Sequence, residues 1–128
     1  MVQLINTTLS PLHPAVVYVF GSQAAGRASQ ESDVDLAILS PSPLTTAQVF
    51  RAGNDLAEVL SRDVDLIDLA RASTVLRKEV LRTGRVIYEN DPHRRQEFEM
   101  YALSDYARLN EERAPVLAAL GHPLPADA

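Results

Sequence analysis

The chain has 128 residues, enough for one domain with its own core and too few for two. Its 46% of hydrophobic and 23% of charged residues are ordinary for a globular protein, and we expect a single domain over residues 1–121 with a flexible tail over 122–128. The absence of cysteine excludes disulfides, zinc–thiolate sites and thiol catalysis, and a net charge of −5 argues against direct binding of nucleic acid.

The sequence carries no targeting or membrane signal. Its first residues, Met1-Val2-Gln3-Leu4, lack the basic, apolar and small-residue regions of a signal peptide. No stretch approaches the roughly 18 uninterrupted apolar residues of a membrane span. We therefore expect a cytoplasmic protein without a membrane partner.

Up to residue 44 the pattern is dominated by two buried strands. The run 15–20 is apolar, partly β-branched and bounded by proline and glycine. A second strand is expected over 34–39, where an apolar run over 36–39 follows Asp35. A short helix over 1–9 is expected before the first strand, and another over 21–27 after it.

From residue 45 onward, helices and strands alternate. Thr45 or Thr46 can cap a helix that ends near residue 61, and the period-two pattern of 63–69 predicts a third strand. A helix from Ser73 to Thr83, stopped by Gly84, and a strand over 86–88 are expected next. A last, long helix opens at Asp91-Pro92, is kinked or split at Pro115 and ends at Gly121. Its apolar stripe consists of Phe98, Ala102, Tyr106 and Leu109. These elements predict one α+β domain with a small mixed sheet of three to five strands.

The residues that carry chemistry flank the two buried strands. Gly21 and Ser22 follow the first strand, and Asp33 and Asp35 stand one residue apart where the second begins. Because strand side chains alternate between faces, both carboxylates point the same way, with Cα atoms roughly 7 Å apart. Two anions repel each other by about 4 kcal/mol at 4 Å and an effective dielectric of 20, so the pair favours a bound magnesium ion.

Asp65, on the third strand, is the natural third carboxylate of this set. Gly21 allows the backbone to approach a phosphate because it has no Cβ, and the Ser22 hydroxyl is a further donor. Together with one or two magnesium ions, the set suits displacement at the α-phosphorus of a nucleoside triphosphate, with Asp65 accepting or relaying the proton of the attacking hydroxyl. Asp63 shares the face of Asp65, and Asp68 lies nearby in sequence, so contributions from these two stay open.

Other readings of the same residues fit less well. An EF-hand is a poor alternative because residues 33–36 lack the loop glycine and continue as an apolar strand. Neither a P-loop Gly-Lys-Ser/Thr nor a Gly-x-Gly-x-x-Gly pattern occurs. Two alternatives remain: a binding module that neutralises a partner by contact, through the C-terminal helix, and a nucleotidyltransferase that acts on a small molecule.

The spacing of Gly21-Ser22, ten residues and Asp33-Val34-Asp35 resembles the signature of the polymerase-β-like nucleotidyltransferase superfamily. The single-domain length and the segments 64–68 and 81–89 are similar to its minimal members. Among these, the chain resembles the MntA-type antitoxins, which are paired with HEPN-domain ribonuclease toxins (HepT). The resemblance covers about residues 15–113.

This resemblance implies an antitoxin that transfers AMP from ATP to a tyrosine of its HEPN toxin, with which it forms a hetero-oligomer, and so blocks the ribonuclease. Gly21 and Ser22 would hold the triphosphate of ATP. Asp33 and Asp35 would bind Mg²⁺ in a two-ion site, and Asp65 would be the third carboxylate and metal ligand.

Overall fold

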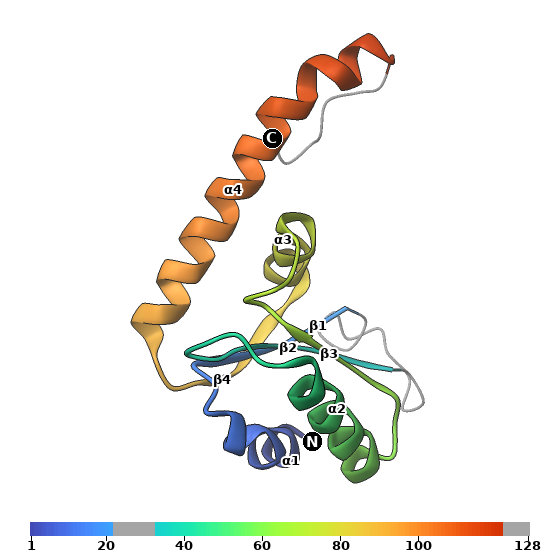
Figure 1. Cartoon of the computed structure of the whole chain (residues 1–128), viewed down its shortest axis with the longest axis vertical. Coiled ribbons are helices and arrows are strands. Elements are labelled where there is room, and N and C mark those ends of the chain that lie inside the picture. The colour runs from blue at the N-terminus through green and yellow to red at the C-terminus, as the bar shows by residue number, and fades with distance from the viewer. Residues whose placement is uncertain (22–32, 122–128) are drawn as a thin grey trace.

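The computed structural model describes residues 1–21 and 33–121 (Figure 1). In chain order the elements are α1 (Val2–Leu9), the 3-10 turn η1 (Ser10–Leu12), β1 (Val16–Phe20), β2 (Val34–Leu39), α2 (Thr46–Leu60), β3 (Val64–Asp68), α3 (Thr74–Thr83), β4 (Arg85–Glu89) and α4 (Pro92–Ala119). The expected elements of the described region are present, with ends that differ by at most two residues. The tail over 122–128, and the helix expected over 21–27 apart from its first residue, lie outside the described residues.

The four strands form one mixed sheet in the order β3-β2-β1-β4. β1 pairs antiparallel with β2 and with β4, whereas β2 and β3 run parallel. A parallel pair needs a crossover connection so that the second strand can start at the same end of the sheet as the first, and α2 is that crossover. The expected α+β class with a small mixed sheet is confirmed.

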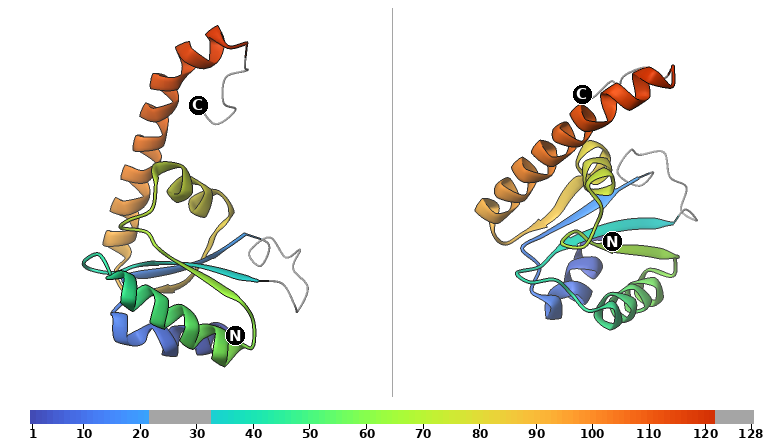
Figure 2. Two further views of the ribbon diagram at one scale, coloured as in Figure 1. Left: turned by 45° about the vertical axis from the view of Figure 1, so that its right-hand side comes forward. Right: turned by 45° about the horizontal axis from the view of Figure 1, so that its top comes forward.

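Helices cover both faces of the sheet, as the two views of Figure 2 show. α1 and α2 pack on one face, against a core that includes Val17, Leu36 and Leu66. α3 and α4 lie over the other face, where Tyr18 and Ala37 contribute to a second core. Because alternate strand residues enter the two cores, each strand in the middle of the sheet is buried on both sides.

The helices begin where the sequence places their caps. The Thr45 hydroxyl accepts a hydrogen bond from the Gln48 N–H at 3.1 Å, and the Gln48 side chain accepts from the Thr45 N–H at 2.8 Å, which makes a complete capping box for α2. Ser73 caps α3 by accepting a hydrogen bond from the Leu76 N–H, and Asp91 caps α4 by accepting one from the Arg94 N–H. These three N-termini are therefore set by local side-chain chemistry.

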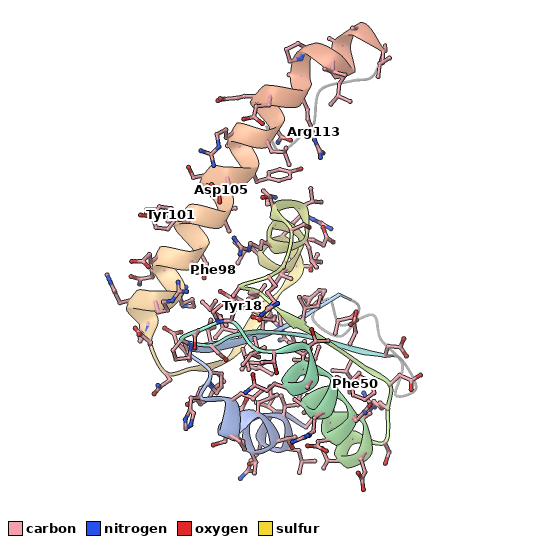
Figure 3. The ribbon with its side chains drawn as sticks, in the orientation of Figure 1. Tyr18, Phe50, Phe98, Tyr101, Asp105 and Arg113 are labelled. Carbon is pink, nitrogen blue, oxygen red and sulfur yellow. The ribbon has the colours of Figure 1, made fainter. Side chains whose placement is uncertain are left out.

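α4 is held to the sheet at its first turns. Phe98 is buried against the second core, and the Tyr18 hydroxyl donates to Glu99 Oε1 at 3.3 Å (Figure 3). Arg95 bridges Glu99 and Glu89 of β4, at 2.7 and 3.2 Å. Burial, followed by the neighbouring Glu99 carboxylate, raises the pKa of Tyr18 above its usual range.

The rest of α4 departs from the sequence expectation in one respect. Of its expected apolar stripe, Ala102 is buried whereas Tyr106 and Leu109 are half-buried. The helix runs unbroken past Pro115 and its ribbon changes direction in the last turns (Figure 1), so of the two outcomes expected at Pro115 the structure shows a kink and not a split. Across residues 1–21 and 33–121, no helix has the length and apolarity that a membrane crossing requires.

Candidate active site

The end of β1 meets the start of β2 at a position that only glycine fits. Phe20 pairs with Asp35 across the two strands, so Gly21 follows directly beside the carboxylate. Gly21 has φ +70°, and a Cβ on it would lie 2.5 Å from Asp35 Oδ2. Its N–H donates to Thr83 Oγ1 at 3.4 Å, and the Thr83 hydroxyl donates to the Glu79 carbonyl at 2.9 Å. The glycine turn is thus fixed between β2 and the end of α3.

Asp65 lies directly beside Asp35 in the sheet. The two residues are register partners in the parallel pair of β2 and β3, and neighbouring strands lie about 4.8 Å apart. Ala37 and Ile67, two residues further along each strand, belong to the core under α3 and α4, so both carboxylates point to that face. Asp33 stands exposed one residue before β2 and completes the set of acidic residues at this end of the sheet.

The three aspartates disturb one another electrostatically. Partial burial, then Asp65, then Asp33, raise the pKa of Asp35 above its ordinary value of 3.8. Desolvation disfavours the charged carboxylate, and each neighbouring anion adds to that penalty. The sheet therefore gathers negative charge around a partly buried carboxylate.

This donor set fits a hard divalent cation. Carboxylate oxygens are the ligands that magnesium prefers, and a cation among them would relieve the repulsion that raises the pKa of Asp35. Within the described ranges, however, no three His, Cys, Asp or Glu side chains are already arranged to hold a metal ion. The two-ion magnesium site of Asp33, Asp35 and Asp65 therefore stays a prediction.

Asp68, which the sequence leaves open as a contributor, has a structural place. Its Oδ2 accepts from the Leu44 N–H at 2.9 Å, its Oδ1 accepts from the Ala70 N–H at 3.1 Å, and Arg71 Nε lies 3.8 Å away. Being three residues from Asp65 along a strand, it points to the opposite face of the sheet. Asp68 thus fixes the loop in front of α2 and does not join the carboxylate set.

The other sequence candidates are placed only in part. Asp63 is exposed one residue before β3, where its carbonyl accepts from the Val34 N–H. Ser22 lies outside the described residues, so its expected contact with a triphosphate stays a prediction. Sequence reasoning misses Thr83, because nothing in its local pattern shows that the end of α3 returns to the glycine turn.

An acidic set beside a glycine turn, at one end of a mixed sheet, defines a class of enzymes that act on phosphates of nucleotides. A model of the family described as Polymerase beta, Nucleotidyltransferase matches residues 3–93. The chain belongs to this nucleotidyltransferase family, as its aspartate spacing leads us to expect.

Known relatives extend the similarity over almost the whole chain. "Protein adenylyltransferase MntA" of Shewanella oneidensis is 31% identical over 120 residues, which covers 91% of this chain and 82% of that protein. A crystal structure of a toxin–antitoxin with AMP-PNP contains a chain with TM-score 0.84 and 30% identity, covering 93% of this chain and 97% of that one. A chain in the structure of the tri-AMPylated Shewanella oneidensis HEPN toxin in complex with MNT antitoxin has TM-score 0.74 and 28% identity. The match covers 94% of this chain and 98% of that one.

Gly21→Ala tests the close approach between the glycine turn and Asp35. We expect a loss of about 1–2 kcal/mol from the left-handed backbone, a further loss from displacement of the carboxylate, and weaker binding of ATP. Urea unfolding and calorimetry measure the two effects. Gly121→Ala is the matched control, since Gly121 has φ +79° and no atom within 4 Å of an added Cβ. Equal losses in both variants would show that backbone strain alone matters.

The raised pKa of Asp35 predicts how stability changes with pH. Because ionisation of Asp35 is less favourable in the folded chain than in the unfolded one, the carboxylate lowers stability as pH rises above about 3.8. In metal-free buffer at pH 7, Asp35→Asn should therefore have a higher Tm than the wild type, and the difference should shrink as pH falls below 4. Asp55→Asn, at an exposed position of α2, is the matched control that removes a carboxylate elsewhere on the chain. A higher Tm for the wild type than for Asp35→Asn at pH 7 would contradict the prediction.

Proposed function

We propose that this chain is the antitoxin of a toxin–antitoxin pair and transfers AMP from ATP to a tyrosine of a HEPN-family ribonuclease, whose activity it thereby blocks. The observation that carries the proposal is the placement of Asp35 beside both Asp65 and Gly21 at one end of the sheet. Relatives that match the chain over almost its full length support the proposal that the acceptor of AMP is a protein. One is named a protein adenylyltransferase, and another is in complex with an AMPylated HEPN toxin.

The proposed reaction is a displacement at the α-phosphorus of ATP. The tyrosine oxygen forms the new bond to phosphorus, the bond between that phosphorus and the oxygen bridging to the β-phosphate breaks, and pyrophosphate leaves. Asp65 accepts the proton of the tyrosine hydroxyl, because it lies on the edge strand next to Asp35. The Gly21 turn, with Ser22, receives the triphosphate where no Cβ obstructs it.

Asp33, Asp35 and Asp65 would hold magnesium in this proposal. The ions supply charge neutralisation to the phosphate oxygens and help orient the attacking and leaving groups. The protein contributes the fixed spacing of the carboxylates, set by the register of β2 and β3. A reaction that consumes ATP also supports the cytoplasm as the place where the chain acts.

A second candidate is neutralisation of the partner by contact alone. α4 carries large apolar side chains that are exposed on this chain, among them Met100, Tyr101 and Leu103. Tyr101 lies on the side of α4 that faces away from α3 (Figure 3). Such residues suit a protein interface. Contact and catalysis predict different outcomes when the carboxylates are neutralised.

The double variant Asp33→Asn, Asp35→Asn separates the two candidates. We expect wild-type protein, ATP and Mg²⁺ to add AMP to a tyrosine of a purified HEPN-family partner, measured by mass spectrometry. The double variant should lose the reaction by at least about a hundredfold, because the charges that position the phosphates are gone. Asp55→Asn, on exposed α2, should retain it.

Two results would count against catalysis. One is an unmodified partner after incubation with the wild type. The other is a double variant that protects cells from the ribonuclease as well as the wild type does, which would make contact sufficient.

A further inference from the structure

A groove lies between α2 and the open edge of the sheet. It has a volume of about 600 Å³ and is lined by residues 64–68 of β3 and, from α2, by Val49, Phe50 and Gly53 among others. Phe50 is 71% exposed, which is unusual for a large aromatic side chain, and it lies on α2 just below the sheet (Figure 3). Asp65 lines the same groove, so the groove continues to the carboxylate set.

The floor of this groove is an unpaired strand edge. Val34 N–H donates to the Asp63 carbonyl, and Leu69 N–H donates to the Ile38 carbonyl. In a parallel pair only alternate residues of a strand bond to a given neighbour, so the odd-numbered residues of β3 face β2. The backbone N–H and C=O groups of Val64 and Leu66 therefore point away from β2. β3 ends the strand order, so among the described residues these groups meet no further strand.

We propose that this groove binds an extended segment of the protein acceptor, the segment that carries the tyrosine to be modified, as an added strand beside β3. The proposal rests on the proposed function, because it assigns the binding site of that reaction's second substrate. A strand added at a sheet edge gains main-chain hydrogen bonds, and pockets for its alternate side chains give selectivity.

The alternation of side chains explains why this edge suits the reaction. Asp65 points to the α3 and α4 face together with Asp35, whereas Val64 and Leu66 point to the α2 face. On an added strand, the residue beside Asp65 would direct its side chain to the carboxylate face. Its two neighbours in sequence would direct theirs to the opposite face, against Val49 and Phe50. The geometry thus assigns an acceptor tyrosine flanked by apolar residues.

Charge along the groove favours a defined placement of that segment. Asp65 lies at the end next to the reacting groups, and Arg71, whose side chain is 60% exposed, lies at the other end. Asp68 is engaged by Leu44, Ala70 and Arg71, so its charge is already balanced. An acidic residue on the acceptor near Arg71 would add to the attraction.

Two groove variants test the proposal. Phe50→Ala removes the aromatic wall, and Gly53→Leu fills the groove, where an added Cβ meets only the Leu66 Cβ at 4.0 Å. Both should raise the KM for the HEPN-family partner at least about tenfold, the scale that corresponds to loss of one anchor side chain. The KM for ATP should stay as in the wild type, because neither residue belongs to the carboxylate set or to the glycine turn.

Val59→Ala is the matched control, because Val59 is an exposed apolar residue of α2, at 46%, that does not line the groove. Unchanged KM for the partner in both groove variants overturns the groove proposal and leaves the proposed function intact. Failure of the wild type to modify the partner overturns both. A dimer of this chain that Phe50→Ala converts to a monomer assigns the groove to a second copy and likewise overturns the proposal.

Discussion

The parallel pairing of β2 with β3 is the constraint on which the site depends. It sets Asp35 and Asp65 side by side, because they are register partners in the two strands. The backbone hydrogen bonds of the sheet fix the spacing of the strands, so the two carboxylates cannot move apart. Burial of Asp35, followed by repulsion from Asp65 and then Asp33, raises the pKa of its carboxyl. Burial of Val34, Leu36 and Ile38 in the core under α2 holds β2 in this register, because a shift by one residue would turn its carboxylate into that core.

Most of the fold follows from local signals. β1 is a continuous apolar run, and so is β2 after Asp35, as is typical of strands that are buried on both faces. The N-caps Thr45, Ser73 and Asp91 set three helix starts. The strand order β3-β2-β1-β4 could not be predicted in this way, since it depends on pairing between residues that are far apart in the sequence, such as Val16 and Glu89. Pro115 shows another limit: the loss of one backbone donor in a long helix is tolerated where the helix is largely exposed.

The site was predictable where it depends on residue type and spacing. Asp33, Asp35 and Asp65 could be predicted as candidates because an acidic residue at the start of an apolar strand is exceptional, and the register of β2 and β3 places Asp35 beside Asp65. Asp68 could not be separated from them by sequence, because its partners Leu44 and Arg71 become neighbours only in the fold. The same holds for Thr83, whose contact with Gly21 spans 62 positions, and for the groove at β3. Long-range contacts therefore decide which acidic residues are structural and which are available to a ligand.

The central claim is that the acidic end of the sheet binds a divalent cation together with a nucleotide. Mn²⁺ in place of Mg²⁺, with AMP-PNP, makes this claim visible by paramagnetic broadening of amide resonances in isotope-labelled protein. Broadening should be strongest at Gly21 and at residues 33–36 and 64–66, and the distal half of α4 should stay sharp. Broadening centred elsewhere, or none at saturating Mn²⁺ and AMP-PNP, would contradict it.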